Sequence, residues 1–509
     1  MTDTRQQLAD RQASGRTLAS GITHLLLSGL AANICLFLAN LAMIHAYGRA
    51  VHGGVVWLYS VASITVGLCD LGIASAAASR SIARLRAAGD ESLGQSVATW
   101  ISLQVLLGIV GAGAMLALAG TIADPRVGIG PGEVRIAAAW VLGMTALRAC
   151  AMVVVGFEVM RETILISPVV ELARLLVVIV AWMVGVPADH IVWILAAWAG
   201  CYALAVAVAA WRVRLLVSRT HSAVTFSAVR PRDMLDAAGA ALPYFIPFLG
   251  LFCLPFAAQM LIGRLAPGVE IKVRGDISVF QVCFSLAMTV RLISGPIAGA
   301  LLPRVAHIDA SHADHTQTAD ILRQSARLLG TASTLLFAGA VAFGEPALRI
   351  IYGQAYAAGI DTLLVLLAFG AIDSYAMPLD QVLKATRHVG IVAALEAARY
   401  AIILAICWWA IPARGFIGAA WAILAASLAT LLVKMWATRG VSASGAVALA
   451  ATGAILAMLA VLHLLTCGHW LALPAWLAAS IALRLLRPAE MLRWTRLIGD
   501  SLTMENSRD

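Results

Sequence analysis

The sequence predicts an all-α integral membrane protein with about 14 transmembrane helices, arranged as two pseudo-symmetric six-helix lobes plus two extra C-terminal helices. Three observations predict this fold class. Of the 509 residues, 61% are hydrophobic and only 12% are charged, whereas soluble domains carry roughly 25% charged residues. Apolar runs recur at about the ~20 residues that one helix needs to cross a bilayer. A sequence motif also repeats at a fixed spacing.

Each apolar run is interpreted as one span. The expected centres, in chain order, lie near residues 33, 66, 108, 144, 177, 201, 251, 289, 337, 370, 401, 426, 454 and 477. Polar or Gly- and Pro-rich breaks fall at 47–54, 80–95, 123–133, 212–236, 267–276 and 304–323. The first apolar run is longer than the ~7–15-residue core of a cleaved signal peptide, so we expect it to be retained as the first span.

Lys and Arg residues alternate between the two sides of the predicted bundle. With the N-terminus placed in the cytoplasm, 24 of the 36 fall on that side, eight on the opposite side and four inside spans. Such a bias is the positive-inside pattern. It predicts that both termini are cytoplasmic, and it accounts for the net charge of +9 without nucleic-acid binding.

An internal repeat organises the spans. Glu-Leu-Ala-Arg at 171–174 recurs 225 residues later as Glu-Ala-Ala-Arg at 396–399. The same offset relates Ala151 to Ala376, Pro187 to Pro412 and Trp211 to Trp436. A duplicated unit with an even number of spans inserts both copies the same way round, with a substrate path expected between them.

This repeat predicts the domain organisation. We expect a cytoplasmic tail at 1–17, an N-lobe at 18–211 holding spans 1–6, a cytoplasmic linker at 212–238, a C-lobe at 239–437 holding spans 7–12, spans 13 and 14 at 438–488, and a cytoplasmic tail at 489–509. Spans 13 and 14 lie outside the repeat and are apolar, so we expect them to face lipid.

Eight charged residues fall within the predicted spans. They are Arg148, Arg174, Arg291, Arg399, Asp70, Glu171, Asp373 and Glu396. Each charge at mid-membrane costs at least ~2.5–3.5 kcal/mol, so each needs a partner or a water-filled cavity. We interpret the four arginines as candidate ligands for the phosphates or sugars of an anionic substrate, because a guanidinium forms bidentate bonds with phosphate. The four acids are candidates for ion coupling or gating.

Two interpretations of these charges stay open. Glu171 and Arg174, like Glu396 and Arg399, are three residues apart and share a helix face, so each pair either stabilises the bundle core or lines the cavity. Arg148 has Asp373 at the equivalent position of the second copy, which suggests bridges from Arg148 to Asp373 and from Asp70 to Arg291 that latch the lobes. Alternatively, Asp70 is a helix-end residue near the headgroups.

Other patterns predict no further chemistry. A loop with His307, His312 and His315 beside Asp309 and Asp314 is interpreted as solvated, and no metal site is predicted. The absence of a GxxxxGK[ST] loop argues against ATP-driven transport, and no cofactor is expected.

Four stretches resemble motifs of one family. They are YGRAVHGG at 47–54, CDLGIASAAASRSIA at 69–83, IIYGQAYAAGIDTLLVLL at 350–367 and GFIGAAWA at 415–422. Together they resemble the polysaccharide-biosynthesis and export branch of the MOP superfamily, which flips lipid-linked oligosaccharides and is related to the lipid II flippase and to MATE transporters. Where some members keep an acid in span 7, this chain has Gln259.

The resemblance implies a non-enzymatic flippase in the bacterial inner membrane. It implies a polyprenyl-diphosphate-linked oligosaccharide as substrate, moved to the outer leaflet by alternating access for cell-surface or exopolysaccharide biosynthesis. Expected partners are membrane lipids and a polysaccharide polymerase or glycosyltransferase. Two alternatives stay open: a MATE-like cation or drug antiporter, which predicts an acidic cavity, and a membrane glycosyltransferase or polymerase, which needs a large outer loop.

Overall fold

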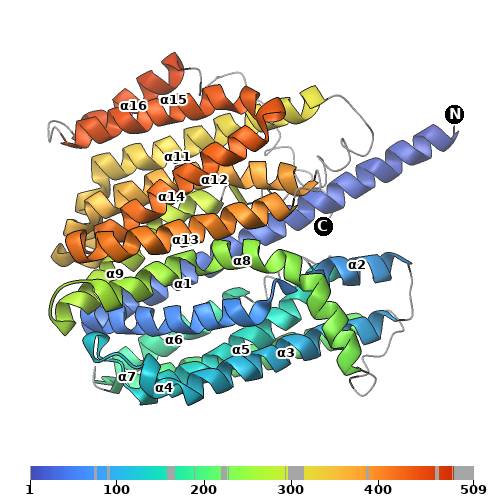
Figure 1. Cartoon of the computed structure of the whole chain (residues 1–509), viewed down its shortest axis with the longest axis horizontal. Coiled ribbons are helices and arrows are strands. Elements are labelled where there is room, and N and C mark those ends of the chain that lie inside the picture. Colours follow the sequence, from blue (N-terminus) through green and yellow to red (C-terminus); the bar gives the residue numbers. More distant parts are fainter. Residues whose placement is uncertain are drawn as a thin grey trace. The chain divides into compact units, whose positions relative to one another are not determined.

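The computed structural model describes residues 2–73, 77–88, 92–157, 167–187, 190–218, 226, 229–292, 294–295, 298, 315–385, 389–464, 469–483 and 485. Within these ranges the chain is helical, with a single isolated β-bridge between Asp124 and Ile129 and no strand. Figure 1 shows the helices in chain order. The predicted all-α fold class is confirmed.

The chain divides into two compact units, each continuous in space but not in sequence. Unit 1 comprises Met1–Ser285 and Val389–Ala422, and unit 2 comprises Leu286–His388 and Ile423–Asp509. This division follows packing, whereas the two predicted lobes rest on the sequence repeat. The lobe boundaries therefore stay a prediction.

Unit 1 contains the helices of the first half and two later segments. Its elements are α1 (Thr2–Asp70), α2 (Ala78–Ala88), α3 (Leu93–Ala117), α4 (Ala119–Ile122), η2 (Pro125–Val127), α5 (Pro131–Gly156), α6 (Ser167–Val184), α7 (Ile191–Ser218), α8 (Pro231–Leu265), α9 (Glu270–Ala287), α13 (Val389–Arg414) and the start of α14 (Phe416–Ala437). In this unit α1 packs against α6 and α8, α5 lies between α3 and α7, and α13 packs against α8.

Unit 2 is built on α11 (His315–Tyr352). Its other elements are η6 (Met288–Val290), η7 (Gln354–Gly359), α12 (Ile360–Ala385), the remainder of α14, α15 (Arg439–Leu464), η8 (His469–Leu471) and α16 (Ala472–Ala482). Helix α11 packs against α12, α15 and α16. Tyr375 on α12 contacts Thr452 on α15 at 2.6 Å, and Trp476 on α16 donates to Thr334 on α11 at 3.0 Å. Polar contacts therefore fix the last two helices to this unit.

The first predicted break is a kink inside α1. Gly48 has φ 81° and ψ 168° and separates two helical segments. A φ in this region favours glycine, which has no Cβ to clash with the neighbouring carbonyl. The two segments contain the expected span centres near 33 and 66, so the two-span prediction agrees with the position of the kink.

The second predicted break separates two candidate spans, Leu27–Asp70 and Leu93–Ala117, but its first part is helical because residues 78–88 form the short helix α2. The segment is amphipathic: Ala78 and Ile82 are buried and Arg84 is exposed. Helix α2 packs against α3 and α5. The polar residues that suggested a loop instead form one face of a short helix, which the packing of its apolar face stabilises.

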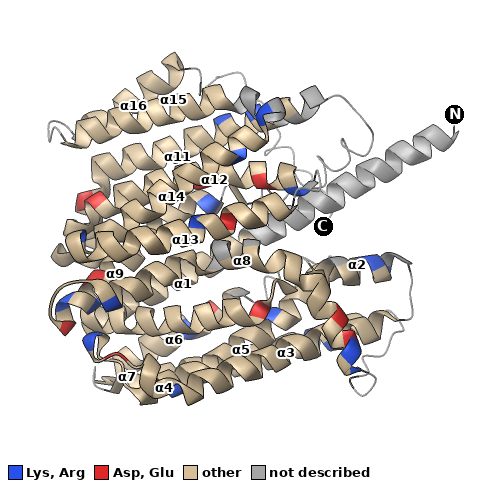
Figure 2. Ribbon diagram, viewed as in Figure 1, with Lys and Arg blue, Asp and Glu red and all other residues tan. Residues whose placement is uncertain are grey.

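All fourteen expected span centres fall within helical segments. Among the described residues, ten helical stretches are long and apolar enough to cross a membrane, and Cys253–Leu265 and Ala472–Ala482 are shorter apolar stretches. The count of 14 spans therefore stays a prediction. Figure 2 shows that charged residues are sparse along the helices and lie mainly near their ends.

Candidate functional site

The first intramembrane ion pair joins Arg148 to Asp70 within unit 1. Asp70 is the last residue of α1, and Arg148 lies in α5, inside the candidate span Pro131–Gly156. The Nε atom of Arg148 donates to Oδ2 of Asp70 at 3.0 Å. The Asp70 side chain is 0% exposed, whereas that of Arg148 is 26% exposed. The acid is thus fully enclosed, and only the arginine offers accessible surface.

Local backbone geometry places Asp70 at this point. Directly after it, Leu71 has φ 48° and Gly72 has φ 81°, and together they end α1. A left-handed conformation is rare for a residue with a side chain such as leucine. A Cβ on Gly72 would lie 2.6 Å from the backbone of Tyr244 and Phe245 in α8, so only glycine permits this close approach. The end of α1 is therefore fixed against α8.

Helix α8 also contributes directly to the site. The guanidinium carbon of Arg148 lies 4.8 Å from the centroid of the Phe248 ring. A guanidinium over an aromatic face gains a cation–π interaction, and this contact adds to the hydrogen bond that Arg148 donates to Asp70. Arg148 is consequently held on two sides, by a carboxylate and by an aromatic ring.

A second pair joins Arg291 to Asp373 within unit 2. Arg291 directly follows η6, and Asp373 lies in α12. Nε and Nη2 of Arg291 both approach Oδ2 of Asp373, at 2.8 and 2.7 Å. The exposed fractions are 27% for the arginine and 2% for the acid. The arrangement matches that of the first pair: an enclosed aspartate holds a partly exposed arginine.

The observed partners differ from the predicted ones. One of the two interpretations pairs Arg148 with Asp373 and Asp70 with Arg291, but each arginine pairs with an acid of its own unit. The reason is that α1 packs directly on α5, and η6 packs on α12. Asp70 is the last residue of α1, which agrees with the alternative that placed it at a helix end. Sequence register identified which residues are equivalent, but helix packing determined which residues meet.

The two Glu–Arg pairs form as the three-residue spacing predicted. Arg174 Nη1 lies 3.0 Å from Glu171 Oε2, and Arg399 Nη2 lies 2.6 Å from Glu396 Oε2. The arginine side chains are only 4% and 2% exposed. Arg174 also lies over Trp198 at 4.2 Å. A ligand contact at Arg174 or Arg399 stays a prediction, and the burial of both side chains argues against it.

A fifth ion pair was missed by the sequence analysis. Lys434 on α14 is one of the 24 Lys and Arg residues that the sequence places on the cytoplasmic side. It is fully buried, and its Nζ lies 2.9 Å from both carboxylate oxygens of Asp380 on α12. The position of Lys434 three residues before the end of α14 suggested a helix terminus near water. The available signal was its place in the apolar run Leu-Leu-Val-Lys-Met-Trp.

Unit 1 also contains an uncharged buried polar network. Ser60 donates to Gln259, which in turn donates to Gln281 on α9. Nearby in sequence, His52 contacts Ser278 at 2.7 Å. Gln259 is 1% exposed. The amide thus takes part in a satisfied network at the position where the resemblance suggested an acid.

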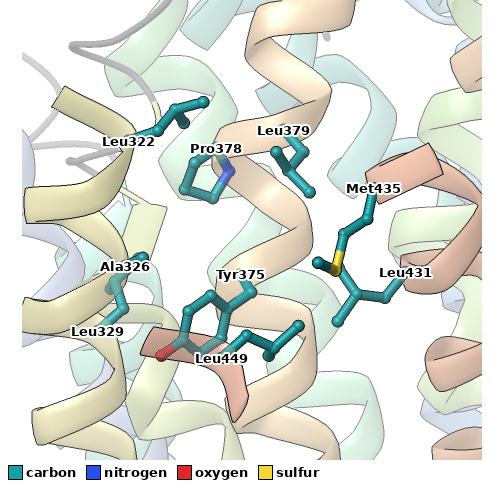
Figure 3. A pocket seen from close by; sticks show the side chains of 9 residues that line it. All are labelled: Leu322, Ala326, Leu329, Tyr375, Pro378, Leu379, Leu431, Met435 and Leu449. Atoms are coloured by element: carbon teal, nitrogen blue, oxygen red, sulfur yellow. The ribbon is translucent and has the colours of Figure 1, made fainter. Parts of the chain in front are cut away.

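An apolar pocket lies in unit 2, close in sequence to the Asp380–Lys434 pair. Figure 3 shows its lining, which consists of Leu322, Ala326, Leu329, Tyr375, Pro378, Leu379, Leu431, Met435 and Leu449. None of these side chains is charged. The pocket therefore does not offer a site for an anion.

No group of three or more His, Cys, Asp or Glu residues is placed to hold a metal ion in the part of the chain that the structure describes. The histidine-containing loop with His307 and His312 lies outside the described residues.

Neither a protein-family model nor a curated protein matches the chain, whereas solved structures match its fold. An inward-facing multidrug resistance MATE family transporter of the MOP superfamily superposes with a TM-score of 0.64 at 16% identity, covering 81% of this chain and 95% of that one. The lipid II flippase MurJ, in an inward closed conformation, superposes with a TM-score of 0.63 at 9% identity, covering 93% of this chain and 99% of that one.

A third match is a MOP superfamily transporter from Pyrococcus furiosus, described by the reverse polarity of its binding pocket. It superposes with a TM-score of 0.56 at 16% identity, covering 83% of this chain and 96% of that one. At these identities the likeness establishes the fold, which is the all-helical fold of MATE transporters and MurJ. These neighbours are transporters and a flippase, not enzymes.

Proposed function

We propose that this protein moves a polyprenyl-diphosphate-linked oligosaccharide from the cytoplasmic to the outer leaflet of a bacterial inner membrane by alternating access. Both termini lie in the cytoplasm, and the step belongs to cell-surface or exopolysaccharide biosynthesis. A glycosyltransferase supplies the substrate and a polysaccharide polymerase consumes it. The observation that carries the proposal is the pair of partly exposed arginines, Arg148 and Arg291, among membrane-type helices.

The exposed surface of these arginines favours an anionic ligand. A charged side chain in hydrocarbon costs at least ~2.5–3.5 kcal/mol, so an arginine whose side chain is about a quarter exposed needs water or a ligand for its charge. Arginine stays charged when desolvated, and its planar fork matches phosphate oxygens. A partly exposed arginine of this kind suits a ligand that presents phosphate oxygens, such as a diphosphate.

The remaining charges have supporting roles in this proposal. Asp70 and Asp373 are the candidate gating or ion-coupling acids, since each is bonded to one of the exposed arginines. The enclosed pairs Glu171–Arg174 and Glu396–Arg399 stabilise unit 1 instead of meeting the ligand.

The fold supports transport by alternating access, and the match to MurJ covers more of this chain than the matches to the other two structures described above. MurJ is named as a flippase of lipid II, a lipid-linked substrate. The alternative is a MATE-like antiporter for cations or drugs, which the structural likeness favours equally. Against that alternative, the acids at both candidate sites are enclosed and the accessible charge is positive.

Binding by the purified protein tests the proposal. Polyprenyl diphosphate and a cationic dye are titrated against wild type over a salt series, and against Arg148→Ala and Arg291→Ala. Each arginine is expected to contribute about 1.5–3 kcal/mol, which is roughly a tenfold to hundredfold loss of diphosphate affinity. Arg349→Ala serves as the control. Arg349 forms an exposed ion pair with Glu345 on α11, so this variant should bind diphosphate with the affinity of wild type.

The same titration separates the two functions. Tight, salt-sensitive diphosphate binding that falls in both arginine variants supports the flippase. Preference for the cationic dye, with release of protons on binding, would identify an antiporter. Unchanged diphosphate affinity in both variants would remove Arg148 and Arg291 from the site.

A further inference from the structure

Helix α12 carries two acids, the buried Asp373 and the partly exposed Asp380, that are held by different neighbours. Asp373 pairs with Arg291, which follows η6, and Asp380 pairs with Lys434 on α14. Asp380 lies seven positions after Asp373, which is about two helical turns, so both project from one face of α12. Two ion pairs, at different points along α12, therefore attach this helix to its neighbours. These ion pairs are its two ionic attachments.

The two attachments differ in accessibility. The Lys434 side chain is 0% exposed and that of Arg291 is 27% exposed. An anion can reach Arg291 and compete with Asp373 for its guanidinium, but it cannot reach Lys434 without displacing packed side chains. The Asp373 attachment is thus open to release by a ligand, and the Asp380 attachment is not.

Pro378 lies inside α12 between the two acids. Proline has no N–H, so it cannot donate to the carbonyl four residues earlier, and its ring crowds that carbonyl. In α12 this carbonyl belongs to Ser374. The helix is consequently weakest in the short segment that separates the two attachments.

The first half of the chain lacks all three residues of this arrangement. At the 225-residue offset, Pro378, Asp380 and Lys434 correspond to Val153, Val155 and Ala209. Asp373, in contrast, corresponds to Arg148, so an ion pair that includes an accessible arginine is present in both halves. The proline and the Asp380–Lys434 pair therefore distinguish α12 from its counterpart α5.

From these observations we propose that α12 bends at Pro378 during the transport cycle. The Asp380–Lys434 pair anchors the C-terminal part of α12 to α14, and the N-terminal part is released when an anionic ligand draws Arg291 from Asp373. Asp380 and Lys434 are thus positioning residues that act through α12 on the Arg291 site. This role rests on the proposed function, because it takes the ligand to be an anion.

Hydrogen–deuterium exchange of the wild-type protein in nanodiscs tests the hinge without any ligand. Residues 374–381 of α12 are expected to exchange at least about tenfold faster than the equivalent residues 149–156 of α5, since the missing hydrogen bond eases local opening. Pro378→Ala should abolish this difference. Pro346→Ala is the matched control, because Pro346 lies inside α11 and its loss should leave α12 unchanged. Equal exchange in α12 and α5 of the wild type would overturn the proposal.

Transport and binding test the anchor. Inorganic pyrophosphate is the binding probe, and flipping of a fluorescent polyprenyl diphosphate in proteoliposomes is the rate assay. Pro378→Ala and the double variant Lys434→Met/Asp380→Leu are expected to bind the probe within twofold of wild type but to flip at least about tenfold more slowly, as expected for loss of a hinge. The apolar double variant leaves no unpaired buried charge, and thermal unfolding verifies that it is folded.

The exchanged pair Lys434→Asp/Asp380→Lys provides the rescue. It restores an ion pair between α12 and α14, so the flipping rate should return to within about threefold of wild type. Wild-type flipping in the apolar double variant, or equal losses of probe affinity and rate, would contradict the anchor. If wild type binds no pyrophosphate, the proposed function fails, whereas the exchange comparison still decides whether α12 has a hinge.

Discussion

Arg148 donates from Nε to Asp70 across 3.0 Å, and the acid is completely enclosed while a quarter of the arginine side chain is exposed. The second half of the chain contains the same arrangement with Arg291 and Asp373. At the 225-residue offset of the repeat, Asp373 occupies the position that corresponds to Arg148. The two halves thus share an ion pair in which the acid and the base have exchanged helices.

This exchange predicts that the first pair tolerates reversal. Arg148→Asp alone leaves two carboxylates together in the membrane region and should prevent stable folding, since an unpaired buried charge costs about 3–5 kcal/mol. Asp70→Arg/Arg148→Asp recreates the order found in the second half and should recover most of that loss. Thermal unfolding in detergent measures both. Equal unfolding temperatures for the single and double variants would contradict the prediction.

Replacing the accessible arginines by lysine should show how much of the diphosphate affinity depends on positive charge and how much on the planar shape of the guanidinium. Arg148→Lys and Arg291→Lys keep the positive charge but lose the planar fork that binds two phosphate oxygens. We expect diphosphate affinity to fall by about tenfold, which corresponds to ~1.4 kcal/mol, and less than in the alanine variants. Isothermal titration checks this order. Lysine variants that bind as wild type does would show that charge alone is recognised.

The enclosed pair Glu396–Arg399 should affect stability and not binding. Arg399→Ala leaves Glu396 buried without its partner and is expected to cost about 3–5 kcal/mol of unfolding free energy, whereas Glu396→Leu/Arg399→Met should cost little. Diphosphate affinity of the folded double variant should equal that of wild type. A large loss of affinity in this variant would place Arg399 in the ligand site.

The attachment of α15 to α12 depends in part on one hydroxyl group. Tyr375→Phe removes the 2.6 Å contact with Thr452. Hydrogen bonds between membrane helices contribute about 0.6 kcal/mol on average and at most ~1.7, so a small decrease in the free energy of unfolding is expected. Thr430→Val is a suitable control, because its hydroxyl bonds within its own helix to Ala426. A decrease of the same size in both variants would argue against an interhelical role.

The number of spans and their orientation can be tested by reporter fusions. With 14 spans and both termini in the cytoplasm, fluorescent protein fused at residue 509 should fold and emit, and periplasmic alkaline phosphatase inserted at the break near 128 should be active. Both results follow from the positive-inside pattern. If alkaline phosphatase were fused at residue 509 instead and were active, the chain would need an odd number of spans or the opposite orientation.

The sequence by itself determined the helical membrane class, the approximate positions of the spans and the two Glu–Arg pairs. Composition and run length report directly on the solvent around a helix, and residues three apart lie on one face of any α-helix. Both properties are local, so they survive without knowledge of neighbouring helices. The kink at Gly48 is also a local property, because it depends on the backbone freedom of one glycine, and it lies within a predicted break.

Only the tertiary structure decided which charges meet across helices. Asp70 reaches Arg148, and Lys434 reaches Asp380, because of how α1 packs on α5 and how α14 lies beside α12. Burial was also decided at this level: Arg148 and Arg399 occupy similar apolar runs, yet one is a quarter exposed and the other is enclosed. The side-chain period of a helix fixes the face of each residue, but the neighbour opposite that face depends on the packing of the whole chain.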